Sequence, residues 1–288
     1  MELAHTVRAE LGESPLWLPE HRVFCWLDLP GRTVHRFDPV TRDNSVIASG
    51  FDTDLACLAR LPDGMALLVS AQGFQRLDPE TGCLSPCACP VQRDPGTCFN
   101  DGKVDGHGAL WLGSSDIREE APLGRLWRIA KDGVTEIAAG IVVSNGPAFA
   151  PDGRAAYFAD TFERRIVRYA LDDEGRVVDS AVFADVADGY PDGLTVDRAG
   201  RVWSAHWDGA CLTRYQPDGS IDNVLPVPAR NVTSCAFGGA DLSTLLVTTA
   251  ADPTGRPTGL ADADGAIFLH DAGLPGLTEP LFEAGDIL

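Results

Sequence analysis

The chain has 288 residues and a formal charge of −19 at pH 7, with 44% hydrophobic and 23% charged residues. This composition is typical of a folded globular protein rather than a disordered one. The negative charge disfavours binding to nucleic acid or to an anionic membrane, because both partners attract clustered Lys and Arg, and the sequence has no such cluster. The 30 glycines and 20 prolines indicate many turns and therefore many short elements.

The predicted elements are almost all strands. Short runs rich in β-branched and aromatic residues recur along the chain and are bounded by turns such as Pro62-Asp63-Gly64 and Pro151-Asp152-Gly153. In chain order, these runs are Val23–Leu27, Thr33–Phe37, Ala66–Val69, Ala109–Leu112, Gly124–Ile129, Ala155–Ala159, Ile166–Tyr169, Arg201–Ala205, Leu212–Tyr215 and Leu245–Thr249. No long amphipathic helix is predicted.

The strands belong to a repeat with a period of about 45 residues. The predicted first strands of the units open at Ser14, Ala56, Asp101, Gly146, Asp192 and Thr233. This spacing predicts an all-β fold, a six-bladed β-propeller with four antiparallel strands per blade, in which residues 1–288 form a single domain. We expect the two ends, Leu3–Glu10 and Pro280–Gly285, to pair in one blade and close the ring, because an unclosed blade exposes a sheet edge.

The composition of the chain indicates its cellular compartment and the state of its cysteines. Residues Met1–Glu10 lack the apolar core of a signal peptide, and no run of about 18 apolar residues occurs, so we expect a cytoplasmic protein with reduced thiols. Most of the eight cysteines stand singly among apolar residues, as small buried side chains do. Cys83, Cys87 and Cys89 form a C-x3-C-x-C run, but no nearby His completes a zinc site.

Polar residues recur at the predicted start of several blades. The segments are Gly12-Glu13-Ser14-Pro15, Phe99-Asn100-Asp101-Gly102-Lys103, Ser144-Asn145-Gly146-Pro147 and Tyr190-Pro191-Asp192-Gly193-Leu194. Any one of them reads as a plain turn, but equivalent positions of a propeller converge on its channel. Glu13, Asn145 and Asp192 would supply two carboxylates and an amide oxygen, which suit a hard divalent cation.

These four segments, in this order and at these separations, resemble the regucalcin/gluconolactonase (senescence marker protein) family over essentially the whole chain. The resemblance implies a six-bladed propeller and a metal-dependent lactonase that opens sugar lactones. It assigns the metal to Glu13, Asn145 and Asp192, makes Asp192 the general base as well, and gives Asn100 a substrate-binding role. The metal would be Ca²⁺, Zn²⁺, Mn²⁺, Mg²⁺ or Fe(II), and it would polarise the lactone carbonyl or activate a bound water.

The sequence departs from the family pattern in two places. Family members often carry Arg two residues before the position of Asn100, where this chain has Cys98. An acidic substrate contact of some members falls near Arg118, flanked by Asp116, Glu119 and Glu120. An arginine facing the channel at 118 would favour a substrate with an anionic group, whereas a solvated loop residue would not.

Other features of the sequence bear on the function. His206 and Trp207 follow a predicted strand, and we expect them at the channel mouth, with His206 either contacting substrate or lying in an ordinary turn. The sequence has no G-x-S-x-G elbow, P-loop or strand-linked GxGxxG, which disfavours a serine hydrolase and nucleotide cofactors. The alternatives to a lactonase are a non-catalytic calcium-binding or regulatory propeller, and a related propeller esterase or phosphotriesterase.

Overall fold

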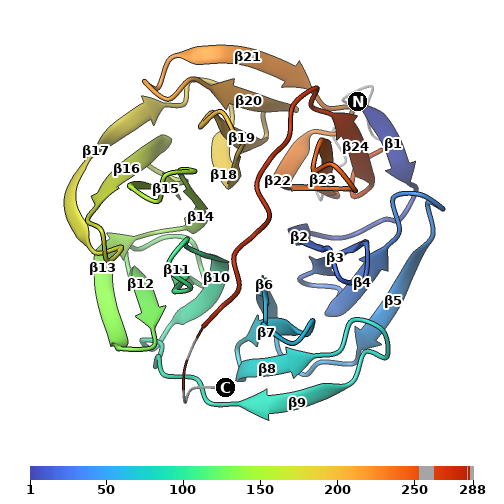
Figure 1. Ribbon diagram of the computed structural model, residues 1–288, viewed down its shortest axis with the longest axis horizontal. Helices are drawn as coiled ribbons and strands as arrows, with labels where there is room; N and C mark the ends of the chain where they lie inside the picture. The colour runs from blue at the N-terminus through green and yellow to red at the C-terminus, as the bar shows by residue number, and fades with distance from the viewer. Residues whose placement is uncertain (253–262, 284, 286–288) are drawn as a thin grey trace.

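A computed structural model describes residues 1–252, 263–283 and 285. The described chain forms six antiparallel sheets of four strands, arranged in a ring around a central channel (Figure 1). The structure therefore confirms the predicted six-bladed β-propeller. None of the described residues forms a helix long and apolar enough to cross a lipid bilayer.

Each of the first three blades is a meander of four consecutive strands that runs outward from the channel. The first blade is β2 (Gly12–Leu18), β3 (Val23–Asp28), β4 (Thr33–Phe37) and β5 (Asn44–Ser49). The second is β6 (Leu55–Arg60), β7 (Ala66–Ser70), β8 (Gly73–Leu77) and β9 (Leu84–Cys87). The third is β10 (Thr97–Val104), β11 (Leu110–Asp116), β12 (Gly124–Ala130) and β13 (Gly133–Ile141).

The next two blades repeat this meander, and the last combines both ends of the chain. The fourth is β14 (Ser144–Phe149), β15 (Ala155–Asp160), β16 (Arg165–Leu171) and β17 (Val177–Asp185). The fifth is β18 (Tyr190–Val196), β19 (Val202–Trp207), β20 (Cys211–Tyr215) and β21 (Ile221–Pro226). The sixth is β22 (Asn231–Gly238), β23 (Thr244–Ala250), β24 (Ile267–Asp271) and the N-terminal β1 (Glu2–His5).

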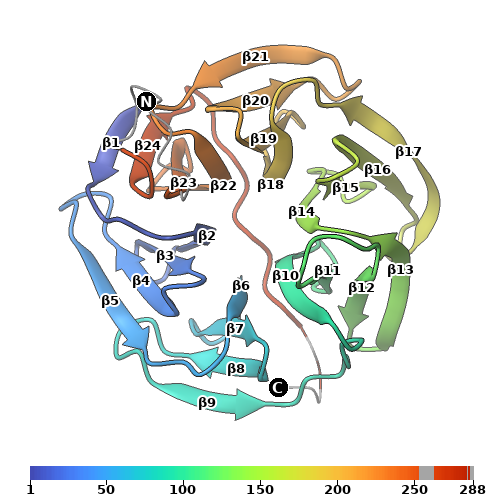
Figure 2. The same ribbon diagram turned by 180° about the vertical axis from the view of Figure 1, so that it is seen from behind.

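The described residues of the two chain ends do not pair with each other, which corrects the expected closure. β1 pairs with β24 and supplies the outer strand of the sixth blade, so the N-terminal end does close the ring. The described part of Pro280–Gly285, which leaves out residue 284, instead belongs to a segment that crosses one mouth of the channel (Figure 1; Figure 2 shows the other side). In this segment Leu281 forms a bridge with Arg60, and Gly276 forms one with Asp197. The C-terminal end is not needed to close the ring, because β1 already covers the edge of β24.

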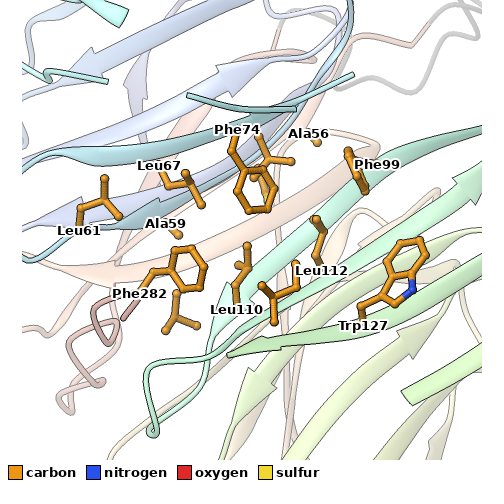
Figure 3. Packing of buried hydrophobic residues seen from close by; sticks show 14 residues of the cluster. Ala56, Ala59, Leu61, Leu67, Phe74, Phe99, Leu110, Leu112, Trp127 and Phe282 are labelled. Atoms are coloured by element: carbon orange, nitrogen blue, oxygen red, sulfur yellow. The ribbon is translucent and has the colours of Figure 1, made fainter. Parts of the chain in front are cut away.

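The core lies between the blades, where apolar side chains of neighbouring sheets pack face to face. Trp26, Trp111 and Trp203, each on the second strand of its blade, are fully buried. Between the second and third blades, Phe74, Phe99, Leu110 and Leu112 form one such layer (Figure 3). Phe282 of the C-terminal crossing segment inserts into the same layer and is fully buried there, as Figure 3 shows.

Candidate functional site

A cavity of about 360 Å³ opens at one mouth of the channel. It is lined from the beginnings of inner strands, whereas the C-terminal crossing segment contacts residues at or just after the ends of inner strands, such as Arg60 and Asp197. The cavity and that segment therefore occupy opposite mouths. Its lining residues are Leu11, Glu13, Leu29, Ala56, Asn100, Asp101, Glu119, Val143, Asn145, Thr161, Phe162, Tyr190, Asp192 and Trp207.

The predicted metal trio and Asn100 reach this cavity from four different blades. Glu13 lies on β2, Asn100 on β10, Asn145 on β14 and Asp192 on β18. They lie inside the inner strands, and not in the loops before them as the sequence motifs suggested. The strand register shifts at each motif, between Glu13 and Leu16, Phe99 and Gly102, Asn145 and Ala148, and Pro191 and Leu194. A β-bulge of this kind redirects a side chain without ending the strand.

The glycine beside Asp192 is required by close packing. A Cβ atom on Gly193 would lie 2.1 Å from Ser234 Oγ and 2.8 Å from Ser234 Cα. Only glycine lets the bulged inner strand of the fifth blade approach the sixth blade this closely. The Asp-Gly pair that reads as a turn in the sequence is therefore a packing requirement at the site.

The amide groups of the site are fixed by hydrogen bonds. Asn100 Nδ2 donates to the Ser144 carbonyl oxygen at 2.7 Å and to Asn145 Oδ1 at 2.8 Å. Asn145 Nδ2 donates to Thr161 Oγ1 at 3.0 Å, and Thr161 Oγ1 donates to the Pro191 carbonyl oxygen at 2.8 Å. This chain orients both amides, so that Asn100 Oδ1 is available to the cavity.

The carboxyl groups of the site repel one another in a buried environment. Burial, together with the charge of Asp101, raises the pKa of Glu13 to about 8. Burial, with the charges of Glu13 and Asp101, also raises the pKa of Asp192 well above its ordinary value. Burial raises the pKa of Asp101 to about 7, and the nearby Lys103 ammonium opposes this rise. A cation among these groups would remove the repulsion.

The donor set fits a divalent cation. Glu13 and Asp192 present carboxylates to the cavity, Asn145 adds an amide oxygen, and all three side chains are buried. Hard cations prefer such oxygen donors, with waters completing the shell. The structure contains no grouping of three or more His, Cys, Asp or Glu arranged to hold a metal among residues 1–252, 263–283 and 285, and this includes Cys83, Cys87 and Cys89.

The structure places Glu119, and not Arg118, at the cavity. Arg118 is 71% exposed and lies 3.8 Å from Glu120. Glu119 lines the cavity, and burial with the charge of Asp116 raises its pKa. Successive residues of a turn point in different directions, and Glu119 has a positive φ of 56°, so residue spacing alone did not identify which one faces inward.

His206 lies beside the cavity, and its neighbour Trp207 lines it. His206 Nδ1 lies 2.9 Å from the Asp188 carbonyl oxygen, so this nitrogen carries the proton and donates. Burial lowers the pKa of His206 and favours its neutral form. Its Nε2 is buried and has no hydrogen-bond partner among the described residues. Of the two residues expected at the channel mouth, Trp207 therefore lines the cavity and His206 does not.

Several cavity residues were not singled out as site residues from the sequence. Asp101 follows Asn100 directly in the same bulge, and Thr161 and Phe162 follow the second strand of the fourth blade. Tyr190 opens β18 two residues before Asp192. Their positions in the repeat could have identified them. The end of the second strand of a blade returns to the same mouth as the start of its first strand, so residues just after a second strand lie near the bulged motifs.

Comparison with known proteins identifies the family. Residues 11–251 match the model for the SMP-30/Gluconolactonase/LRE-like region. The chain is 34% identical over 283 residues to a 6-deoxy-6-sulfogluconolactonase of Pseudomonas putida, with 94% of each chain covered. It is 35% identical over 285 residues to a pentonolactonase of Haloferax volcanii, with 93% of each covered.

A solved structure shares both the fold and the family. The crystal structure of a calcium-binding protein, regucalcin, from Agrobacterium tumefaciens superimposes with a TM-score of 0.89 at 30% identity. The match covers 98% of this chain and 97% of that one. Together with the convergence of the four bulged motifs on one cavity, these matches show that the chain belongs to the SMP-30/gluconolactonase family.

Proposed function

We propose that this protein is a metal-dependent lactonase that opens the ring of a sugar lactone, of the aldonolactone type, to the sugar acid. The observation that carries the proposal is the convergence of Glu13, Asn145, Asp192 and Asn100 from four blades on one cavity. Membership of a family with several named sugar lactonases supports the same activity. A scaffold that binds neither metal nor substrate has no need for this donor set.

Each residue has a role in the hydrolysis of a cyclic ester. A divalent cation held by Glu13, Asn145 and Asp192 would polarise the lactone carbonyl and lower the pKa of a nearby water. Asp192 takes the proton of the attacking water and returns it to the ring oxygen as the ring opens. Asn100, held by its two donated hydrogen bonds, presents Oδ1 to a substrate hydroxyl. Glu119 accepts a hydrogen bond from another hydroxyl at the cavity wall.

The proposed substrate is uncharged. The expectation of an anionic group depended on Arg118 facing the channel, and Arg118 is exposed and paired with Glu120. Among the residues that the structure describes, the cavity lining contains four acidic side chains and no Lys or Arg. A bound cation neutralises part of this charge, and the remainder disfavours an additional anion.

The test is hydrolysis of a panel of aldonolactones, followed by acid release, in wild type and in Asp192→Ala. We expect metal-stripped protein to be inactive, added divalent cation to restore it, and Asp192→Ala to lose about a thousandfold in turnover. Asp179→Ala, on the exposed outer strand β17, is the matched control and retains wild-type turnover. A wild-type rate in Asp192→Ala would contradict the mechanism.

The same experiment separates the alternatives. Metal binding without hydrolysis of any lactone or ester would support a non-catalytic calcium-binding propeller. Faster hydrolysis of aryl esters or phosphotriesters than of every aldonolactone would support the related propeller esterase.

A further inference from the structure

Three aromatic side chains from two neighbouring blades line the cavity. Tyr190 opens β18 and Trp207 ends β19, and the two residues face each other as Cα partners in the sheet. Phe162 follows β15 in the neighbouring blade, and its ring centroid lies 6.1 Å from that of Tyr190. All three line the cavity. We call this group the aromatic wall.

The aromatic wall is held in place from outside the cavity. The Arg164 guanidinium lies 4.3 Å from the centroid of the Tyr190 ring, a cation–π contact that fixes the ring plane. The Arg164 backbone NH donates to the Thr161 carbonyl oxygen at 3.1 Å, which closes the turn that carries Phe162. Phe162 is nevertheless 45% exposed, so its ring offers apolar surface for a ligand to cover.

The rest of the lining adds apolar surface and few spare donors. Leu11, Leu29, Ala56 and Val143 complete the apolar part of the cavity. The Thr161 hydroxyl donates to the Pro191 carbonyl oxygen, and the Asn100 amide NH₂ donates to Ser144 and Asn145. The Phe162 ring offers no hydrogen-bond partner to a substrate hydroxyl, whereas a methyl group packed on the ring would gain apolar burial.

We propose, resting on the lactonase function above, that this protein prefers a 6-deoxy sugar lactone, whose terminal carbon is a methyl group rather than a hydroxymethyl group. The methyl group and the adjacent C–H face of the sugar pack on Phe162, Tyr190 and Trp207. The hydroxyls on the other part of the ring face Asn100 and Glu119. The aromatic wall thus determines specificity, and the carboxylates and amides of the inner strands carry the chemistry.

The test compares pairs of lactones that differ only in the oxygen at carbon 6, in the galacto, gluco and manno configurations. In each configuration that is hydrolysed, we expect kcat/KM to be about tenfold or more higher for the 6-deoxy form than for its hydroxylated partner. Phe162→Ala and Trp207→Ala should bring this ratio close to one by raising KM for the 6-deoxy form, with kcat within about twofold.

Two further variants test whether the preference depends on an aromatic surface at the cavity. Trp207→Phe keeps an aromatic face and should retain most of the preference. Ile221→Ala removes an exposed apolar side chain from the outer strand β21, away from the cavity, and should leave the ratio unchanged. Because Phe162 is half exposed, Phe162→Ala should fold normally, which circular dichroism checks.

The outcomes distinguish this inference from the function on which it rests. If the protein hydrolyses no lactone, the proposed function fails and the inference fails with it. Hydrolysis of lactones with equal or reversed preference at carbon 6 overturns the inference alone. A preference that persists unchanged in both Phe162→Ala and Trp207→Ala also overturns it, because the aromatic wall would then not be its source.

Discussion

At the scale of single residues, two buried aspartates organise the hairpins that carry the site. Asp197 follows β18, and its Oδ2 accepts from Trp203 Nε1 and from Arg201 Nε, both at 3.0 Å. Asp105 follows β10 and accepts in the same way from Trp111 Nε1 and Arg128 Nε, also at 3.0 Å. Each carboxylate joins the end of the inner strand to the second strand of its blade, and Asp197 does so for β18, the strand that carries Asp192.

We expect Asp197→Ala to lower the free energy of unfolding by about 3 kcal/mol, because it leaves the buried indole NH of Trp203 without its acceptor and removes one carboxylate partner of the half-buried Arg201 guanidinium. Chemical denaturation measures the change. Asp197→Asn, which keeps one acceptor oxygen, should lose less. Asp241→Ala, on an exposed turn, should lose about 0.5 kcal/mol or less. An Asp197→Ala variant as stable as wild type would refute this role.

His35 makes the stability of the first blade depend on pH. It is buried, stacks on Trp26 with a centroid distance of 3.9 Å, and accepts from Asn44 Nδ2 at 3.1 Å through Nδ1. Burial lowers its pKa from the ordinary value of 6.5 to about 4. The unfolded chain therefore binds a proton between these pH values that the folded protein does not bind, so stability falls as pH falls through this range.

The expected size of this effect is about 3 kcal/mol at pH 4, relative to a variant without the imidazole. The measurement is the difference in free energy of unfolding between wild type and His35→Gln, determined at pH 7 and again at pH 4. Wild type should lose stability relative to His35→Gln on acidification. A difference that does not change with pH would show that His35 titrates normally in the folded state.

At the scale of elements, the C-terminal crossing segment connects the closed mouth of the channel to the site. Its Glu279 Oε1 lies 3.3 Å from Lys103 Nζ, and Lys103 Nζ donates to the Leu194 carbonyl oxygen at 2.8 Å. The positive charge of the Lys103 ammonium in turn opposes the rise in the pKa values of the buried Asp101 and Glu13 carboxyls. The segment is therefore a structural part of the channel, and Phe282 attaches it to the core between the second and third blades.

We expect Phe282→Ala to lower the free energy of unfolding by about 3 to 5 kcal/mol, because it leaves a cavity in that core layer. Thermal or chemical denaturation provides the value, and Val40→Ala, at an exposed position, is the control with little change. If Phe282→Ala unfolds with wild-type stability, the crossing segment does not contribute to the core in the way that Figure 3 shows.

At the scale of the whole molecule, the net charge of −19 and the carboxylates at the channel predict that divalent cations stabilise the folded protein. Acidic side chains held close together in the folded state destabilise it, and a cation that binds only the folded site stabilises it by mass action. Part of the negative charge noted in the sequence therefore belongs to the site, in Glu13, Asp101 and Asp192.

We expect Ca²⁺ or Mn²⁺ added to metal-stripped protein to raise the free energy of unfolding by about 2.7 kcal/mol when the cation is at a hundred times its Kd. Differential scanning fluorimetry follows the midpoint. Glu13→Gln should reduce the metal-dependent increase, whereas Glu174→Gln, on an exposed turn, should leave it intact. An equal increase in Glu13→Gln and wild type would place the cation elsewhere.

Much of the fold could be predicted from the sequence because each blade repeats the same local pattern. The repeat period predicted six blades, and strands such as Thr33–Phe37 and Leu212–Tyr215 formed where the apolar runs indicated them. The motifs around Glu13, Asn100, Asn145 and Asp192 could also be found, because they recur at the same position of their blades. Their placement within bulged strands could not, because a bulge interrupts the alternation by which strands are recognised.

By itself, the sequence determined the all-β class, the number of blades and the four motifs of the site, since these depend on local strand propensity and on a regular period. Tertiary structure alone decided that the C-terminal segment crosses the channel, that Glu119 and not Arg118 lines the cavity, and that Phe162, Tyr190 and Trp207 line it together. These features depend on contacts between residues far apart in the chain and on the direction of individual side chains in turns. No local pattern encodes either, because both are settled only when the blades pack together.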